Sequence, residues 1–366
     1  MSIALVIALT FGFLLLFSRH KNKKADRFLA ALIFIVALWN ASILILVLGI
    51  YRYAAGIIWI PLTYTLAIGP CFYFYIRYIT DTDLTQKPRI WPHFIPVVFE
   101  VGLFLIEVFQ GLPLGVGYFA TTTFLIFDPI ISALAIISLM IYSFIARKRI
   151  KKYHQWVENN YSHYHRYNLN WLLRLSTIFL IVLTLWLGYF CIDYFLFDYK
   201  LSFTEYYPFH LTLAIISIWL SVEAYSKPEI IYPEQIEQLE TINSSKSVTD
   251  DEIQEQAAWL KQQIERDLLY LDPELSLKSL ADTIDLHPNL VSKIINEGLK
   301  QTFSDCINEY RVKAVINKIG TDNDESLTFL AIAFDCGFNS KTTFNRVFKK
   351  QTGLTPLQYR NNLQNN

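Results

Sequence analysis

The chain has 366 residues, of which 53% are hydrophobic and 17% are charged, and its formal net charge is zero. This hydrophobic share is high for a soluble globular protein. The zero is the sum of +6 in residues 1–226 (17 Lys and Arg less 11 Asp and Glu) and −6 in residues 227–366 (15 less 21), so it excludes no class of partner. The four cysteines lie far apart without a CxxC pair, which excludes a disulfide framework and a metal site of closely spaced ligands.

Residues 1–226 hold seven apolar segments, each at or near the length of about 20 helical residues that crosses a hydrocarbon core. The first is short, but it lacks the basic start and cleavage pattern of a signal peptide, so a retained helix is expected. The predicted fold is therefore all-α, with a seven-transmembrane-helix bundle as its first domain. The seven segments are Ser2–Phe17, Phe28–Ile50, Ile57–Ile79, Phe94–Leu112, Thr123–Ile145, Trp171–Phe197 and Pro208–Tyr225.

Lysine and arginine are distributed unequally between the loops that join these segments. With the N-terminus outside, the inner loops hold thirteen of them and the outer loops only Arg52 and Lys200. The positive-inside rule then predicts an external N-terminus and, after an odd number of spans, a cytoplasmic C-terminal part. The thirteen inner residues are Arg19, Lys21, Lys23, Lys24, Arg27, Lys87, Arg89, Arg147, Lys148, Arg149, Lys151, Lys152 and Arg166.

Three carboxylates fall at membrane depth in this scheme. Glu100 and Glu107 are seven residues apart and share one helix face, and Asp128 lies in the next segment. Such groups are costly in a membrane and face the bundle interior or a cavity. One interpretation is structural pairing between helices, for example with Arg77 or Arg174. The other is a ligand site or a proton path, and the sequence leaves both open.

Residues 227–270 form an acidic linker that ends in an amphipathic helix. Apolar residues at steps of three or four run from Ile253 through Ala257, Leu260 and Ile264 to Leu268, with Thr249 or Asp250 as the N-cap. This stripe is too short to establish a coiled coil. It either docks on the C-terminal domain or pairs with a second chain.

Residues 271–362 repeat one pattern twice. A helix-turn-helix needs a small residue where the helices cross and, four positions later, a residue that tolerates positive φ. The second unit has Ala333 and Gly337, and the first has Ala281 and Asp285. His287-Pro288 and Asn339-Ser340 then begin new helices as caps.

The second helix of each unit separates into an apolar and a polar face. Val291, Ile294 and Ile295 face the core in the first unit, and Phe344, Val347 and Phe348 do so in the second. The outward residues are of the types that hydrogen-bond base edges and phosphates in the major groove. The second helix of the second unit carries four cations, Lys341, Arg346, Lys349 and Lys350, with no acidic residue between them. The predicted DNA-binding residues are Asn289, Ser292, Lys293, Asn296, Lys341, Thr342, Asn345, Arg346, Lys349 and Lys350.

About a quarter of the chain, from Tyr270 to Tyr359, resembles the DNA-binding domain of the AraC/XylS family of bacterial transcription regulators. YLDPELSLKSLADTIDLHPNLVSKIIN resembles the first unit of that domain, TFSDCINEYRVKAV its connecting helix with Arg311, and CGFNSKTTFNRVFKKQTGLTPLQYR its second and most specific unit. The resemblance implies seven helices, with two recognition helices entering successive major grooves roughly 34 Å apart. The fusion to a multi-span domain resembles a membrane-bound subset of this family with sensor domains.

The sequence thus predicts a membrane-tethered regulator of the bacterial cytoplasmic membrane that senses a signal and binds promoter DNA. A transporter-like protein with a regulatory DNA-binding domain is the alternative, although no pair of broken helices supports it. Without an HExxH, GxSxG or P-loop motif, no enzyme activity, cofactor or metal is expected. The expected partners are double-stranded promoter DNA, the lipid bilayer, and a small-molecule or peptide signal that the sequence does not identify. A second copy of the chain and RNA polymerase are further candidates.

Overall fold

The computed structural model describes residues 2–17, 23–50, 53–80, 89–114, 122–162, 167–197, 207–226, 250–321 and 328–364. Within these ranges the chain is helical and contains no β-strand, only an isolated antiparallel bridge between Tyr161 and Ser276. The prediction of an all-α fold is therefore confirmed for the described residues. The chain divides into two compact units, Met1–Lys151 with Leu169–Gln238, and Lys152–Asn168 with Leu239–Asn366.

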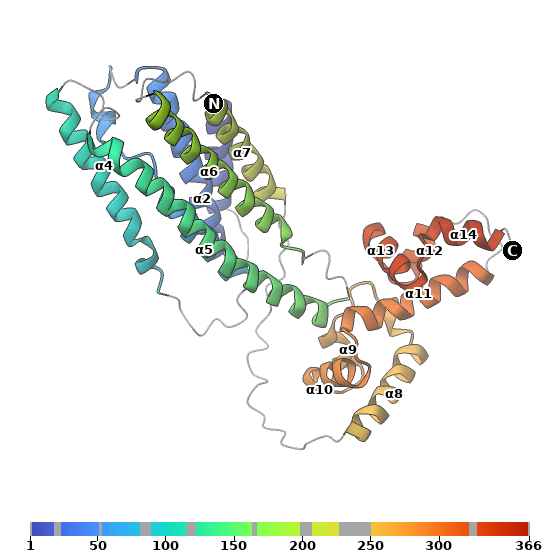
Figure 1. The fold of residues 1–366 in the computed structure, drawn as a ribbon. Helices are drawn as coiled ribbons and strands as arrows, with labels where there is room; N and C mark the ends of the chain where they lie inside the picture. Colours follow the sequence, from blue (N-terminus) through green and yellow to red (C-terminus); the bar gives the residue numbers. More distant parts are fainter. Residues whose placement is uncertain are drawn as a thin grey trace. The chain divides into compact units, whose positions relative to one another are not determined.

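The first unit is built from helices, as Figure 1 shows, and most of them are apolar. By length and composition, four helical stretches among the described residues are able to cross a membrane: Lys23–Val47, Trp91–Gln110, Ile126–Asn160 and Asn170–Phe197. Ser2–Phe17 and Ala214–Glu223 are shorter apolar stretches, so the count of seven spans stays a prediction. The helices are α1 (Ser2–Phe17), α2 (Lys23–Val47), α3 (Ile68–Thr80), α4 (Ile95–Leu114), α5 (Thr122–Asn160), α6 (Asn170–Phe197) and α7 (Tyr207–Ser226).

The predicted third span, Ile57–Ile79, is wrong as a single helix. A 3₁₀ helix, Ala55–Trp59, comes first, and α3 begins only after a second 3₁₀ turn, Thr65–Ala67. Ile60 is extended, with φ −91° and ψ 113°. It precedes Pro61, whose ring disfavours the helical conformation of the residue before it and which itself lacks an N–H group. The hydrophobic run is therefore long enough for a span, but its proline divides it.

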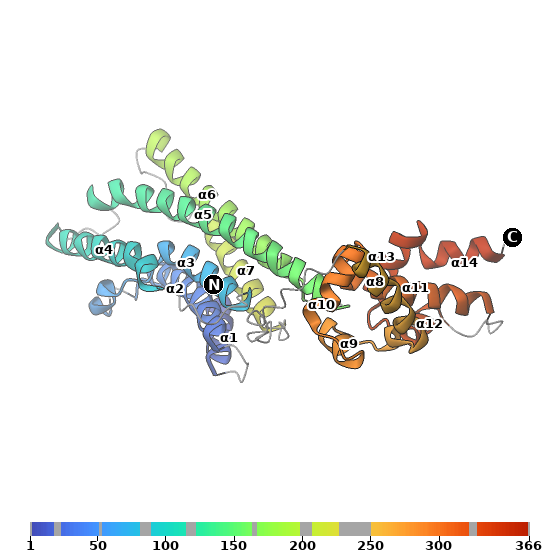
Figure 2. The same ribbon diagram turned by 90° about the horizontal axis from the view of Figure 1, so that it is seen from below.

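Among the described residues, the second unit carries seven α-helices besides the end of α5. Figure 2 shows them from below. It has two apolar cores, and α11 contributes to both of them. Phe303, Ile307 and Tyr310 lie in the first core, and Val312 and Val315 lie in the second. The helices are α8 (Asp250–Arg266), α9 (Leu277–Thr283), α10 (Pro288–Lys293), α11 (Phe303–Thr321), α12 (Phe329–Asp335), α13 (Lys341–Thr352) and α14 (Pro356–Gln364).

The apolar stripe of α8 is used within the second unit. Ile253, Ala257, Leu260 and Ile264 are all at most 3% exposed, and the last three belong to the first core. Leu268 does not continue the stripe: it lies beyond the end of α8, has a φ of 50° and is 49% exposed. Of the two alternatives for this helix, the structure therefore contains the docked one.

Arg311 of α11 lies in sequence between the residues of the two cores, and its side chain is fully buried. Its Nε donates to the carbonyl oxygen of Tyr270 at 2.8 Å, and its Nη2 donates to that of Asp272 at 2.7 Å. Burial lowers the pKa of the guanidinium to about 10, while the nearby carboxylates of Asp272 and Glu274 act in the opposite direction. Arg311 therefore stays cationic at neutral pH. It holds the segment that leads into α9 against α11.

Gly337 lies against the same carbonyl. Its φ is +88°, and a Cβ built there would lie 2.4 Å from the Tyr270 oxygen and 3.0 Å from Arg311 Nε. Gly353, at the end of α13, has a similar φ of +76° but open space around it. A side chain would thus meet backbone strain at both positions, but a steric conflict only at Gly337.

We predict that Gly337→Ala destabilises the second unit by at least about 2 kcal/mol, because strain at positive φ adds to an overpacking cost. Gly353→Ala, the matched control, carries only the strain and is expected to cost about 1 kcal/mol. Hydrogen exchange of peptides from α11 to α13, measured on the full-length chain, gives the local opening free energies. Equal protection in the two variants would show that the close approach to Tyr270 and Arg311 is tolerated.

Candidate nucleic-acid interface

The first helix-turn-helix consists of α9 and α10. Ser276 caps α9: its Oγ accepts from the Ser279 N–H at 3.1 Å, and the Ser279 hydroxyl oxygen accepts from the Ser276 N–H at 2.9 Å. Ala281 is fully buried, and Asp285 takes the left-handed conformation with φ 54°. His287 caps α10 with Pro288 in its first turn. The small residue, the turn and the cap predicted for this unit are therefore confirmed.

The second helix-turn-helix consists of α12 and α13. Thr328 caps α12, Ala333 is fully buried and Gly337 makes the turn at positive φ. Ser340 caps α13, since its Oγ accepts from the Thr343 N–H at 3.4 Å. Asn339, the other residue of the predicted cap, instead donates from Nδ2 to Glu274 Oε1 at 3.1 Å. The structure thus selects one of the two polar residues as the cap.

The α10 side of the candidate interface is partly polar and partly enclosed. Val291, Ile294 and Ile295 are buried as predicted. Asn289 and Asn296 are exposed, whereas Ser292 and Lys293 are half-buried. The helix widens after Lys293 into a π-helical turn, Ile294–Gly298, so Asn296 lies in that turn and donates to Ser292 Oγ at 3.2 Å.

The α13 side is the more exposed and the more basic. Phe344, Val347 and Phe348 are buried in the second core, as predicted. Arg346 is half-buried. Lys350 is exposed, but it pairs with Asp305 of α11 at 2.8 Å. The other predicted DNA-binding residues of this helix, Lys341, Thr342, Asn345 and Lys349, are exposed.

Helices α10 and α13 are therefore each packed on a core on one side and polar on the other, and α11 connects the two cores. Sequence reasoning missed Asp305. The residue is 45 positions before Lys350, and no local spacing connects it to the cationic helix.

The candidate ligand carboxylates of the first unit have different environments. Glu100 accepts from the Thr65 N–H and hydroxyl, both at 2.7 Å, and from the Leu66 N–H at 3.1 Å. Those N–H groups belong to the 3₁₀ turn that leads into α3, so Glu100 satisfies a helix start that Pro61 has interrupted. Two backbone N–H groups and the Thr65 hydroxyl, rather than Arg77 or Arg174, thus supply its hydrogen bonds.

Asp128 is the acidic residue to which Glu100 and Glu107 are both linked electrostatically. It precedes Pro129 inside α5. Its Oδ2 atom is buried and has no hydrogen-bond partner among the described residues. The structure therefore brings the three predicted carboxylates into one neighbourhood and gives Glu100 a structural role there.

Comparison with known proteins concerns the second unit. The model of a family described as a helix-turn-helix domain matches residues 280–362. Over 90 residues the chain is 32% identical to the uncharacterized transcriptional regulatory protein YesN of Bacillus subtilis (strain 168), a match that covers 24% of this chain and 24% of that protein. The match thus spans about a quarter of the length of this relative. No solved structure matches the present chain. The C-terminal part of this chain is accordingly a DNA-binding domain of the AraC family type, with two helix-turn-helix units joined by α11.

Proposed function

We propose that this protein is a membrane-tethered transcription regulator whose apolar part, residues 1–226, senses a signal. The linker and amphipathic helix of residues 227–270 then join it to a DNA-binding domain at residues 271–362. The observation that carries this proposal is the presence, in one chain, of a helix-turn-helix pair and of helices long and apolar enough to cross a membrane. Mapping of the DNA bound in cells by crosslinking to the full-length chain tests it, and enrichment of discrete promoter fragments is the expected result.

Exposed apolar side chains on the first unit support the membrane assignment. Val98 and Phe109 of α4 are 73% and 68% exposed, and Leu185 and Phe195 of α6 are 62% and 74% exposed. A soluble protein rarely leaves this much large apolar surface in water, whereas lipid tails would cover it. The other three helices of this unit, α1, α3 and α7, would complete a bundle of seven spans.

Basic residues at helix ends support an orientation with the C-terminal domain in the cytoplasm. Lys23 and Lys24 begin α2, and α5 continues beyond its apolar part through a cluster from Arg147 to Lys152. Several loop residues that enter the charge count, among them Arg19, Lys21 and Lys200, lie outside the described residues. The full ratio of thirteen basic residues in the inner loops to two in the outer loops therefore comes from the sequence.

We predict that a green fluorescent protein fused after residue 230 is fluorescent and that alkaline phosphatase fused there is inactive. Cytoplasmic placement of that residue follows from the positive-inside rule. A fusion of each reporter in the first outer loop, near Arg52, is the matched control and is expected to give the opposite pair of signals. Phosphatase activity after residue 230 would reverse the topology and remove the access of the domain to DNA.

DNA binding through α10 and α13 is the proposed role of the ten polar residues named from the sequence. Asn345 and Arg346 are its test positions, because they adjoin buried Phe344 and Val347 on the outward side of α13. Asparagine pairs well with adenine, and arginine with guanine or phosphate, in the major groove.

We predict that Asn345→Ala and Arg346→Ala each weaken binding to a mapped operator by about 1–3 kcal/mol while the domain stays folded. Fluorescence anisotropy with an operator duplex and a scrambled duplex measures this effect at one stated salt concentration. Lys261→Ala, which removes an exposed cation from α8, is the control and should leave binding unchanged. Operator affinity equal to that of the parent chain in both α13 variants would show that the recognition face is assigned wrongly.

For signal sensing we propose the neighbourhood of Glu107 and Asp128. The buried Asp128 oxygen is available to a ligand that donates a hydrogen bond or carries positive charge. Glu100 is assigned instead to holding the start of α3. A ligand shifts the equilibrium only by its differential affinity for two conformations, so these carboxylates should alter response rather than DNA affinity itself.

We predict that Glu107→Gln with Asp128→Asn abolishes or mimics the signal in a promoter reporter at normal protein level. Glu100→Gln is the comparison: it weakens acceptors for two backbone N–H groups, so a lower protein level is expected instead. Immunoblots of membrane fractions and reporter output are measured together. A normal response of the double variant would move the sensing site elsewhere.

A further inference from the structure

The end of α5 and the turn after it belong to the second unit. The unit boundary falls between Lys151 and Lys152, inside a helix that is continuous from Thr122 to Asn160. Tyr153 and Val157 on this stretch are 3% and 1% exposed. We call residues 152–162 the docking segment, because they pack with the DNA-binding domain although most of them continue the apolar helix α5.

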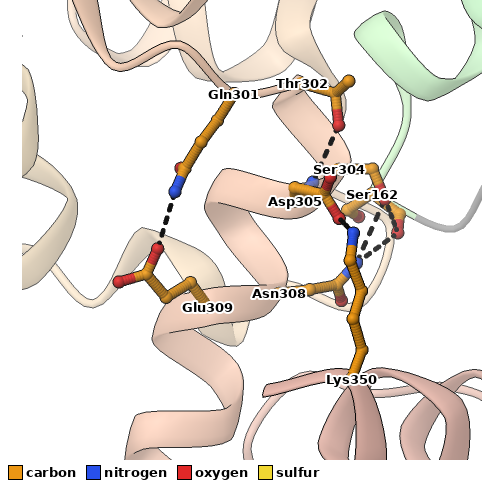
Figure 3. Close-up of polar contacts among 8 residues, drawn as sticks. All are labelled: Ser162, Gln301, Thr302, Ser304, Asp305, Asn308, Glu309 and Lys350. Carbon is orange, nitrogen blue, oxygen red and sulfur yellow. Dashed lines mark hydrogen bonds and ion pairs between the residues drawn. The ribbon is translucent and has the colours of Figure 1, made fainter.

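Ser162 is the polar anchor of the docking segment (Figure 3). It is fully buried, and its Oγ donates to the Leu275 carbonyl oxygen at 2.9 Å and accepts from Arg311 Nη2 at 3.2 Å. Its carbonyl oxygen accepts from Ser304 Oγ at 3.1 Å and from Asn308 Nδ2 at 3.2 Å. A buried network in which each group is satisfied specifies one arrangement, because an unpaired member would be costly.

The anchor lies at the centre of the DNA-binding domain. Ser304, Asn308 and Arg311 are all on α11, the helix that joins the two cores. The Leu275 carbonyl precedes the cap of α9, and Tyr161 forms an antiparallel bridge with Ser276. The docking segment thus contacts both the start of the first helix-turn-helix and the connecting helix.

One turn before the anchor, Glu158 interacts electrostatically with two cations of α13. Burial and Asp305 raise the pKa of Glu158, whereas Lys350 and then Arg346 act to lower it, so all three charged groups lie within electrostatic reach of this carboxylate. Lys350 also pairs with Asp305 at 2.8 Å, as Figure 3 shows. Two carboxylates that are remote in sequence therefore offset cations that the proposed function assigns to DNA phosphates.

We propose that the docking segment is an autoinhibitory contact, in which Glu158 competes with DNA for Arg346 and Lys350 while Ser162 holds the segment on α11. This inference rests on the proposed function. In the docked state the positive potential of α13 is reduced and its affinity for phosphate is low. Undocking removes the Glu158 carboxylate from the surroundings of both cations.

The covalent path from a signal to this contact is α5 itself. Asp128 and Glu158 lie on the same uninterrupted helix. A rotation or translation of its apolar part therefore displaces Glu158 without any change in the linker of residues 227–249. The docking segment is the element with two states, docked and undocked. A ligand that favours the undocked state raises the affinity for DNA, because the two equilibria are linked.

The test uses the full-length chain in lipid nanodiscs and an operator duplex obtained by the mapping experiment. Glu158→Gln is expected to tighten operator binding at least about five-fold, within the usual range of coupling between sites. Glu255→Gln is the matched control: it makes the same charge change at an exposed position of α8 and is expected to leave affinity unchanged. Hydrogen exchange of α11 and α13 peptides confirms that each variant is folded.

A double-mutant cycle with Lys350→Gln separates competition from a general structural effect. If Glu158 acts by offsetting this cation, the gain from Glu158→Gln should shrink at least two-fold in the Lys350→Gln background. Wild-type affinity in a folded Glu158→Gln variant, or an undiminished gain in the cycle, would overturn the autoinhibitory contact and leave the proposed function intact. Failure of the parent chain to prefer any mapped duplex over a scrambled one would overturn both.

Discussion

The buried guanidinium of Arg311 is the interaction on which the arrangement of the DNA-binding domain depends. A charge inside a protein persists only where donors and acceptors compensate its desolvation, and removing one partner of such a group costs several kcal/mol. Arg311 meets this condition with the carbonyl oxygens of Tyr270 and Asp272, between the two cores along α11. The same carbonyl of Tyr270 leaves no room for a side chain at residue 337. The turn of the second unit is thus tied to the entry of the first.

The network also extends to a segment from the apolar half of the sequence. The Ser162 hydroxyl accepts a hydrogen bond from Arg311. The Ser162 carbonyl oxygen accepts hydrogen bonds from Ser304 and Asn308. If the chain spans a membrane as proposed, the cytoplasmic end of α5 is part of the folded DNA-binding domain rather than a passive loop. Tethering and regulation would then share one set of hydrogen bonds, because movement of α5 acts directly on the helix that spaces the two recognition helices.

Carboxylates that are fully or partly buried have distinct physical surroundings in the two units. Glu100 offers its oxygens to N–H groups at an interrupted helix, as a helix start requires. Asp128 has a buried oxygen without such donors among the described residues, which makes it the better candidate for a ligand. Asp305 pairs with Lys350 of α13, and Glu158 interacts electrostatically with the same lysine. Composition alone treats all four as equivalent negative charges.

The sequence by itself determined the all-α class, the apolar helices and both helix-turn-helix turns, because these follow from local periodicity and from residues such as Ala281, Asp285, Ala333 and Gly337 that a turn demands. It also identified the buried faces of α10 and α13. It failed over Ile57–Ile79, where hydropathy measures apolar length but not the hydrogen bond that Pro61 removes. Only the tertiary structure decided that α8 packs into the first core, and it alone brought Asp305 and Glu158 to the cations of α13. Asp305 is 45 positions from Lys350 and Glu158 lies still farther from it, so no local spacing encodes these relations.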